Sequence, residues 1–474
     1  MGETRTDSPS MLRYQADIPV VDESDVLVVG AGPAGIAAAV SSARNGARTT
    51  LIEKNGYVGG NLTAGLVGPC MTSYSLDGEE QLIRGVFDEL VRRMETIGGA
   101  LHPSGIPAGS EYCGFIVFGH DKVTPFEPEA VKLCATEMLL EAGVKLQLHT
   151  FVADTIVEDN AVAGVVTASK SGLEAFRAKV TVDCSADADV AVRGGASYEQ
   201  GRTEDGLTQP MTMFFRVANV DDEVVKRYVA DHPEDFRPFA SIVAKAREVG
   251  EFPVQRRGIG LYKTLEPGVW RINTSRLHRL DGTDVRDLTT GEIEGRRQVD
   301  ALMRFFRTWL PGFEKAVLLD TAATVGVRET RRIVGDYVLT IEDLAEGREF
   351  DDVIALCGYP VDIHSPTDDS GGVGDGYRTA NVYQIPYRSL VPAGLDGVLV
   401  AGRALSATHE AQGATRVMPP SFAMGEAAGA AAAIAVRDGT QPRGVSIPAL
   451  HQVLVRQGAW LGERVQQRVG QTVS

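Results

Sequence analysis

A G-x-G-x-x-G turn between a strand and a helix constrains the fold of this chain more than any other feature. The stretch "SDVLVVGAGPAGIAAAVSSARNGARTTLIEK" opens with an apolar run at Asp25–Val29. It continues through Gly30, Gly32 and Gly35 into an alanine-rich segment and ends in a second apolar run. Short apolar runs of this kind are typical of buried parallel strands, and with the helix between them they form a βαβ unit of about thirty residues. The sequence therefore predicts an α/β fold with a Rossmann-like domain.

The glycines of this turn each have a physical role in holding a dinucleotide. Gly30 permits the tight turn, Gly32 lets a pyrophosphate approach the backbone, and Gly35 lets the helix pack closely on the sheet. The helix N-terminus then faces the phosphates with free N–H groups and the positive end of its dipole. Glu53 ends the second apolar run, where an acid accepts hydrogen bonds from ribose hydroxyls. The expected cofactor site also includes Pro33, Ala34 and Lys54.

Charge and hydropathy limit the classes of partner. The chain of 474 residues has a net charge of −16, which argues against nucleic-acid or anionic-membrane partners. The longest apolar run, Ala427–Val436, is too short to span a bilayer, and the first 24 residues lack the apolar segment of a signal peptide. We therefore expect a cytoplasmic protein that acts on a small molecule, with homo-oligomerisation left open.

Cysteine spacing argues against several redox and metal sites. The closest pair of the five cysteines, Cys113 and Cys134, is 21 positions apart, so the chain has no CxxC. This argues against a dithiol redox motif, a zinc knuckle and a cysteine-rich iron–sulfur binding run. We expect reduced thiols and no metal site.

The pattern of elements changes along the chain. Residues 24–202 and 383–440 read as strands followed by helices, whereas residues 203–382 differ in character. The length fits two or three domains. The sequence therefore predicts one cofactor domain built from both chain ends, with an α+β substrate domain and its mixed sheet inserted between them. Residues 1–23 are expected to be a flexible lead and residues 441–474 a helical tail.

Individual elements are predicted inside the inserted region. Strands are expected in "QPMTMFFRVA" and "KAVLLDTAATVG", and helices in "DDEVVKRYVAD", "FASIVAKAREVG" and "EIEGRRQVDALMRFFRTWL". Ahead of this region, "EEQLIRGVFDELVRRMETI" reads as an amphipathic helix. The segment "SPTDDSGGVGDGYRT", residues 365–379, is expected to be a mobile loop.

Together these motifs resemble a known family. The fingerprint, with "IEKNGYVGGNLTAGLVGPCMTSY", "GVRETRRIVGDYVLT" and "IPYRSLVPAGLDGVLVAGRALSATHEAQGATRVMP", is similar to FAD-dependent oxidoreductases of the two-dinucleotide-binding-domain superfamily. That superfamily includes the fumarate reductase and glutathione reductase flavoproteins. The resemblance extends over residues 24–438 and implies FAD as cofactor. A second strand–GxGxxG–helix unit for NAD(P)H does not occur in the sequence.

The resemblance implies roles for further residues. The fingerprint glycines and Glu53 would hold the ADP half of FAD. Gly59, Gly60 and Asn61 would line the phosphates and the ribityl chain, although a plain turn is the alternative for the glycine pair. Val152 would meet the adenine through its backbone.

Two places depart from the superfamily pattern. Asp187, in "CSADADV", takes the place of the acid in a Thr-Gly-Asp element, with Ser185 and Ala186 replacing the threonine and glycine. Gly402 and Arg403 stand where a glycine and an acid usually bind the ribityl–phosphate region. An arginine there leaves the contact with the hydroxyls to be supplied elsewhere.

The segment "ATHEAQGATRVMPP" concentrates polar residues just before an alanine-rich helix expected to begin at about Ser421. The positive end of that helix, near Met418 and Ser421, would stabilise negative charge on a reduced flavin. Arg416 is a candidate to bind a substrate carboxylate or carbonyl, and His409 a candidate general base. The alternatives are an arginine–glutamate pair for Arg416 and a structural histidine for His409.

Two more catalytic candidates come from other segments. Arg328, in the charged run "GVRETRR", could present a cation to the pocket between domains, although such clusters are more often ion pairs. His364, in "YPVDIHSP", is a possible acid or base.

Two functions fit these features. The first is an FAD-dependent dehydrogenase that moves hydride between a small organic substrate and flavin N5, acting on a CH–CH, CH–OH or CH–NH bond. The second is a flavin-containing electron-transfer or structural subunit that acts with a partner. The sequence leaves open the substrate, the direction of reaction, the electron acceptor and whether the flavin is covalently attached.

Overall fold

A seven-stranded sheet forms the centre of the larger lobe in the computed structural model, which describes residues 12–473. The strand order is β3-β2-β1-β6-β5-β4, and β17 pairs with β6. Pairings β1–β2, β2–β3, β1–β6 and β6–β17 are parallel, whereas β4–β5 and β5–β6 are antiparallel. The strands are β1 (Val20–Val29), β2 (Thr49–Ile52), β3 (Lys145–Gln147), β4 (Phe151–Glu158), β5 (Ala161–Ser169), β6 (Gly172–Asp183) and β17 (Val398–Val400).

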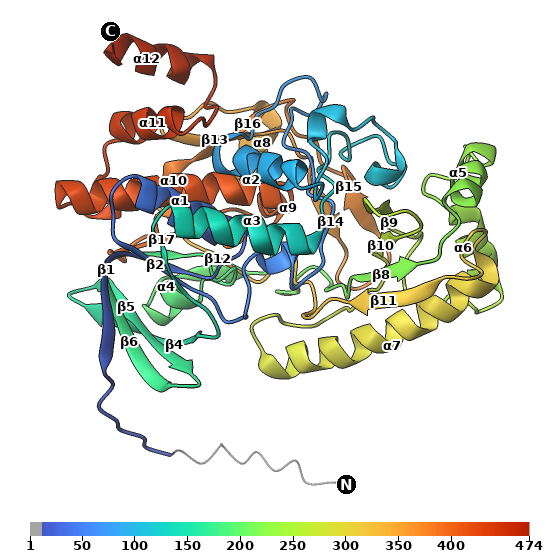
Figure 1. Cartoon of the computed structure of the whole chain (residues 1–474), viewed down its shortest axis with the longest axis horizontal. Coiled ribbons are helices and arrows are strands. Elements are labelled where there is room, and N and C mark those ends of the chain that lie inside the picture. Colours follow the sequence, from blue (N-terminus) through green and yellow to red (C-terminus); the bar gives the residue numbers. More distant parts are fainter. Residues whose placement is uncertain (1–11, 474) are drawn as a thin grey trace.

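Two helices from opposite ends of the chain pack together on this sheet. They are α1 (Pro33–Arg44) and α10 (Met418–Asp438), and they lie side by side above the strands in Figure 1. A Cβ at Gly425 or Gly429 of α10 would come within 2.0 or 2.1 Å of a backbone oxygen of α1. The contact therefore needs glycine, and it joins the C-terminal segment to the N-terminal βαβ unit. Helices α2 (Gly85–Thr96) and α3 (Pro128–Glu141) cover the same side.

A second lobe holds the inserted sheet. Its order is β11-β8-β10-β9, and all three pairings are antiparallel, whereas the sequence predicts a mixed sheet here. Large buried side chains such as Phe215, Trp270 and Phe306 give this lobe its own core. Its elements are β8 (Phe215–Ala218), α5 (Asp222–Asp231), α6 (Ala240–Glu248), β9 (Leu261–Lys263), β10 (Trp270–Ile272), α7 (Val285–Trp309) and β11 (Val317–Thr321).

Short elements complete the structure outside the two larger sheets. Three two-stranded sheets join β7 to β12, β13 to β16 and β14 to β15. The strands are β7 (Tyr198–Gln200), β12 (Arg331–Ile333), β13 (Val353–Cys357), β14 (Asp362–His364), β15 (Gly371–Val373) and β16 (Tyr383–Pro386). The remaining α-helices are α4 (Asp189–Arg193), α8 (Ile341–Glu346), α9 (His409–Thr415), α11 (Ile447–Arg456) and α12 (Glu463–Val473). The architecture is the predicted α/β fold with an α+β insertion.

Several predicted boundaries are wrong. Strand β1 begins at Val20, inside the segment expected to be a flexible lead, and residues 1–11 lie outside the described part. The expected loop at 365–379 contains β15, which pairs with β14. Helix α7 begins at Val285, seven residues before the predicted start, because Asp284 caps it through Arg286 N. Helix α2 begins only at Gly85, which has a φ of 59°.

The described chain has two further general properties. Among residues 12–473, no helix is long and apolar enough to cross a membrane. All five cysteines lie in this part, and each is buried and forms no disulfide bond.

Candidate flavin site

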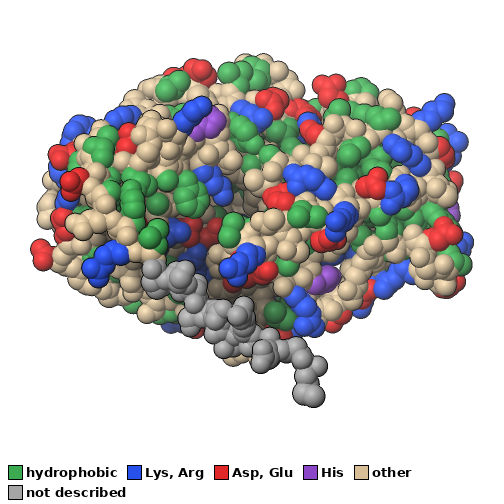
Figure 2. Space-filling view, turned by 90° about the horizontal axis from the view of Figure 1, so that it is seen from below, with side chains coloured by type: hydrophobic (Ala, Val, Ile, Leu, Met, Phe, Trp, Pro, Cys, Tyr) green, Lys and Arg blue, Asp and Glu red, His purple; other side chains and the backbone are tan. Residues whose placement is uncertain are grey.

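A cavity opens where the carboxyl ends of β1, β2, β6 and β17 meet the inserted lobe. Its walls come from the fingerprint loop, the end of β2, the loop after β6, the loop after β17 and the start of α10. Figure 2 shows the surface hollowed where the two lobes meet. Ligands of open α/β sheets bind at this edge. The inserted lobe contributes Gly282, Leu288, Glu292, Thr324, Val325 and Val327.

The three fingerprint glycines occupy different surroundings. A Cβ at Gly30, where φ is 92°, would lie 2.5 Å from Cys184 O, and one at Gly35 would lie 1.7 Å from Gly30 O. A Cβ at Gly32 would meet nothing closer than Gly60 Cα at 3.9 Å, and Gly32 lines the cavity. Gly30 and Gly35 are therefore required by the protein's own packing, whereas Gly32 keeps the cavity open for a ligand.

Glu53 lies against the fingerprint loop. Its Oε2 accepts a hydrogen bond from Ala31 N at 2.7 Å, and its Oε1 accepts from Asn55 N at 2.9 Å and Asn55 Nδ2 at 2.7 Å. The residue is 5% exposed and lines the cavity. These contacts hold the carboxyl group in place and leave it acceptor capacity for ribose hydroxyls.

A second glycine pair, Gly59 and Gly60, packs closely against the fingerprint loop. Gly59 and Gly60 have φ values of 115° and 53°, and a Cβ at Gly60 would lie 2.8 Å from Gly32 Cα. Gly59 N donates to Ala31 O at 2.7 Å. Gly60 and Asn61 line the cavity, and Gly59 positions them from behind.

The loop after β6 keeps a glycine-like conformation without glycine. Ala186 has a φ of 75°, a value that favours glycine. Buried Asp183 holds the loop, since its Oδ1 accepts from Ser185 N at 3.0 Å and its Oδ2 from Val190 N at 2.9 Å. Ser185 and Ala186 can therefore replace the usual threonine and glycine, because the side chain of Asp183 supports the strained turn.

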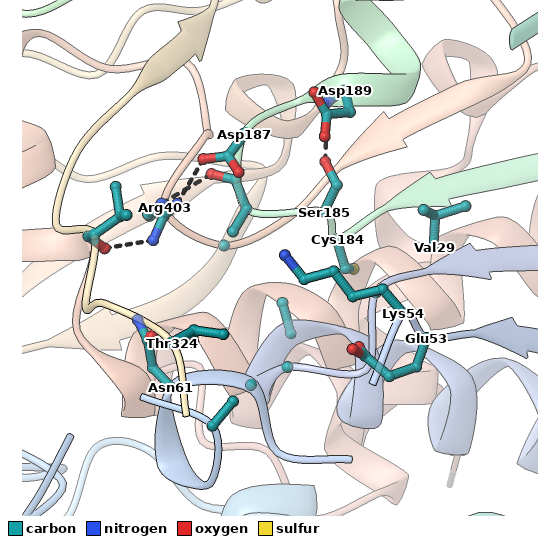
Figure 3. A pocket seen from close by; sticks show the side chains of 18 of the residues that line it. Val29, Glu53, Lys54, Asn61, Cys184, Ser185, Asp187, Asp189, Thr324 and Arg403 are labelled. Carbon is teal, nitrogen blue, oxygen red and sulfur yellow. Dashed lines mark hydrogen bonds and ion pairs between the residues drawn. The ribbon is translucent and has the colours of Figure 1, made fainter. Parts of the chain in front are cut away.

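Arg403 is tied to that loop. It donates to Asp187 Oδ1 at 2.5 Å, to Ala186 O at 3.0 Å and to Val327 O at 2.5 Å. In Figure 3, Arg403 and Asp187 face each other on one side of the cavity, and Glu53 and Val29 lie on the other side. Arg403 therefore pairs with Asp187 and also contacts the inserted lobe through the carbonyl of Val327.

Helix α10 begins at Met418, three residues earlier than the sequence predicts. Pro419 and Pro420 therefore lie within its first turn. A helix normally leaves about four N–H groups free at its start, and these prolines remove two of them. Ser421 N bonds to Val417 O at 3.2 Å. The start of α10 still offers its dipole and the N–H groups of Val417 and Met418.

His409 lies in a buried charge network. It is the first residue of α9, a short helix that the sequence does not predict. Its Nδ1 lies 2.7 Å from Oε1 of fully buried Glu329, which also accepts from Arg332 Nη1 at 2.6 Å. Glu329 Oε2 accepts from Gln209 N at 3.1 Å. These contacts favour the structural alternative for His409.

Arg416 lines the cavity and pairs with Asp362. Its Nη2 donates to Asp362 O at 2.8 Å and Oδ2 at 3.1 Å, and its Nε is buried without a hydrogen-bond partner. Burial alone raises the pKa of Asp362, but the charges of Arg416 and Arg328 outweigh it, so the net shift is downward. Asp362 is therefore ionised. It lies two positions before His364 on one strand, a spacing that places both on one face.

Arg328 and His364 lie beside Asp362. Arg328 Nη1 donates to Pro210 O at 2.9 Å, and burial followed by the charge of Arg416 lowers its pKa to about 10. His364 Nε2 lies 3.3 Å from Asp362 Oδ1. Burial and then the charges of neighbouring arginines hold the pKa of His364 well below its usual range. A neutral imidazole with so low a pKa is a weak base, which disfavours general base catalysis by His364.

The cavity brings together most of the residues expected from the sequence. Those that line it are Gly30, Gly32, Pro33, Ala34, Glu53, Lys54, Gly60, Asn61, Val152, Asp187, Gly402, Arg403, Arg416, Met418 and Ser421. Within the described chain, Gly35, Gly59, Arg328, His364 and His409 lie outside its lining.

The fold and cavity define a dinucleotide-binding α/β protein, and comparison places it in a family. A profile of the FAD-dependent oxidoreductase family matches residues 25–454, so the chain belongs to that family. FAD is therefore the cofactor. The open Cβ position of Gly32, the carboxylate of Glu53 and the close turn at Gly60 all fit its binding.

Curated relatives match only part of the chain. Thiamine thiazole synthase of Aeropyrum pernix is 36% identical over 143 residues, which cover 30% of this chain and 43% of that protein. Digeranylgeranylglycerophospholipid reductase of Methanocaldococcus jannaschii is 40% identical over 65 residues, which cover 14% of this chain and 17% of that one. The chain thus spans less than half the length of either relative.

Solved structures show a distant likeness. L-proline dehydrogenase from P. horikoshii has a TM-score of 0.43 at 14% identity, covering 93% of this chain and 99% of that one.

Proposed function

We propose that this protein catalyses a two-electron oxidation or reduction of a small organic substrate bound between its two lobes. One observation carries this proposal. A single cavity runs from the dinucleotide fingerprint and Glu53 to Arg416 and the start of α10. When bound, FAD supplies hydride acceptance or donation at flavin N5, for a CH–CH, CH–OH or CH–NH bond.

The chain's own residues would divide the remaining tasks. Glu53 and the fingerprint loop hold the nucleotide end, and the Asp187–Arg403 pair closes the middle of the cavity against the inserted lobe. The dipole of α10 favours negative charge near Met418. Arg416 is held by Asp362 with its Nε unpaired, so it retains a donor for the substrate.

Anaerobic reduction of the flavin tests this function. The purified holoprotein is mixed with a panel of small metabolites, with NADH and NADPH included, and flavin absorbance near 450 nm is followed. Bleaching by a small compound, with no protein partner added, supports the proposal. A protein that neither carries FAD nor binds it on addition contradicts it. Bleaching only in the presence of a partner protein supports the electron-transfer alternative instead.

A further inference from the structure

Four arginines gather beside the β14–β15 hairpin, at the boundary of the inserted lobe. Arg256 and Arg276 are buried, with only 8% and 6% of their surface exposed, and Arg328 and Arg416 are partly exposed. We call these four residues the arginine cluster. No motif in the sequence marks Arg256 or Arg276 as site residues.

Hydrogen bonds within the cluster go mainly to neutral groups. Arg328 donates to Thr212 Oγ1 at 2.5 Å and to Asn273 Oδ1 at 3.3 Å. Arg256 Nη1 donates to Asn273 O and lies 3.4 Å from Asn273 Oδ1. Asn273 therefore holds two guanidinium groups side by side, although like charges repel.

Two donors at the cluster lack partners. Arg276 Nη1 and Gln209 Nε2 are buried without a hydrogen bond, and Gln209 is 1% exposed. Gln209 lies next to the cluster, since its Oε1 accepts from His364 N at 3.2 Å. His364 Nε2 lies 3.3 Å from Oδ1 of Asp362, the ion-pair partner of Arg416. Buried donors in native proteins are nearly always satisfied, so unsatisfied ones mark a place where a ligand or an ordered water can bind.

Positive charge in the cluster exceeds negative charge. Across residues 12–473, Arg416 forms an ion pair with Asp362, whereas Arg256, Arg276 and Arg328 form none. Burial, then the charges of Arg237 and Arg328, lowers the pKa of Arg256 to about 9. Burial, then Arg256 and Arg328, lowers the pKa of Arg276 well below its usual range. Such an arrangement destabilises the fold unless an anion offsets it.

The cluster adjoins the flavin cavity. Arg416 lines that cavity and, through Asp362, is joined to His364 and the rest of the cluster. An anionic group held by the cluster would therefore leave the remainder of the same molecule near the start of α10.

We propose that the arginine cluster is the oxyanion-binding part of the substrate site, so that the substrate is a small organic molecule carrying a carboxylate or a phosphate. The inference rests on the proposed function and names its substrate class. Guanidinium groups match both oxyanions because their N–H donors form a planar fork.

Anion titration of the holoprotein tests the assignment. Succinate, inorganic phosphate and the neutral analogue succinamide are each titrated by calorimetry, with flavin absorbance as a second signal. We expect succinate or phosphate to bind and succinamide not to bind, and the anion that binds identifies the class. Failure of both anions to bind overturns the proposal.

Substitution of Arg276 separates binding from folding. Arg276→Met removes an unpaired buried charge, so we expect anion affinity to fall about tenfold or more and the melting temperature without anion to rise. A structural arginine would give the opposite change in melting temperature. Unchanged anion affinity in this variant overturns the proposal.

Arg271 provides a matched control. It is also buried, at 3% exposure, but it donates to Phe126 O at 3.0 Å and lies 4.7 Å over the Phe126 ring, outside the cluster. Its Nε is also buried without a hydrogen-bond partner, so Arg271→Met removes a comparable buried charge at a site away from the cluster and should leave anion affinity unchanged. Equal loss of anion binding in both variants contradicts a specific site.

The two proposals fail in different ways. Flavin bleaching by a neutral compound, combined with no anion binding, removes the substrate class and leaves the oxidoreductase function. Absence of bound FAD removes the proposed function whatever the anions do.

Discussion

At the scale of single residues, burial and pairing distinguish two side chains from one short segment. His409 Nδ1 lies 2.7 Å from Glu329 Oε1, within a buried network that also holds Arg332. Arg416, from the same segment, lines the cavity and keeps its Nε unpaired. Arg416 is therefore the stronger candidate for substrate contact, and His409 the stronger candidate for a structural role.

Replacing Arg416 should affect turnover more than flavin binding. Arg416→Gln keeps a donor for Asp362 but removes the charge, so we expect kcat/KM to fall about 10- to 100-fold with the flavin content unchanged. The ratio of flavin to protein absorbance and the anaerobic reduction rate measure the two effects. Arg437→Gln, at an exposed site on α10, serves as control. Loss of bound FAD, or an unchanged rate, would refute the assignment.

At the scale of elements, the fingerprint loop separates glycines that serve packing from one that serves a ligand. Gly35 lies against Gly30 O, whereas Gly32 faces the cavity. The two positions therefore predict opposite phenotypes for the same substitution to alanine.

The matched pair Gly32→Ala and Gly35→Ala tests this difference. For Gly32→Ala we expect a stability cost below about 1 kcal/mol and FAD affinity reduced about tenfold or more, because the methyl group occupies ligand space. For Gly35→Ala, whose Cβ would lie 1.7 Å from Gly30 O, we expect destabilisation of about 3 kcal/mol. Urea unfolding of the apoproteins and FAD titration measure both, and reversed phenotypes would contradict the assignment.

Helix α10 also carries a buried acid remote from the cavity. Glu426 is 3% exposed, and its carboxylate accepts from Val86 N at 3.1 Å and from Gln457 Nε2 at 3.0 Å. Burial raises its pKa from 4.5 to about 7. The folded protein therefore holds a proton there that the unfolded chain releases.

The stability of the protein should depend on pH through Glu426. The stabilising contribution is complete below pH 4.5 and is lost as pH rises through about 7. The unfolding free energy should fall by roughly 3 kcal/mol across this window. Glu426→Gln should remove most of that decrease, so the unfolding free energy of the variant relative to the wild type should rise as pH increases. Denaturant midpoints at pH 5 and pH 8 measure it, with Glu129→Gln, at an exposed position of α3, as control. A parallel pH dependence in both proteins would count against this account.

At the scale of the whole molecule, Arg403 links the two lobes through the cavity. It joins the loop after β17 to Asp187 after β6 and to Val327 of the insertion. Asp187 also accepts from Thr330 Oγ1 at 2.7 Å. This one contact network therefore fixes how both lobes enclose the cofactor.

A double-mutant cycle tests that link. Arg403→Met and Asp187→Asn should each weaken FAD binding about tenfold, and the double variant should lose less than the sum, with a coupling of about 1–2 kcal/mol. Fluorescence titration of apoprotein with FAD gives the affinities. Arg388→Met, which breaks a pair with Asp352, serves as control. Additive losses would show that the two residues act independently.

Much of the site was predictable because its signals are local. The fingerprint glycines and Glu53 belong to one βαβ unit, where spacing fixes geometry. The start of α10 was misplaced because Pro419 and Pro420 fit the first turn of a helix as well as the segment before it. Asp362 was missed although its spacing from His364 places both on one strand face.

The sequence by itself determined the α/β fold and the FAD fingerprint, since both rest on contacts between neighbours in the chain. Only the tertiary structure decided which charged residues meet. Arg256, Arg276, Arg328 and Arg416 come from four separate segments, and their shared environment depends on how the inserted lobe packs against the β14–β15 hairpin. Burial and charge imbalance are properties of that packing, so no local pattern in the sequence reports them.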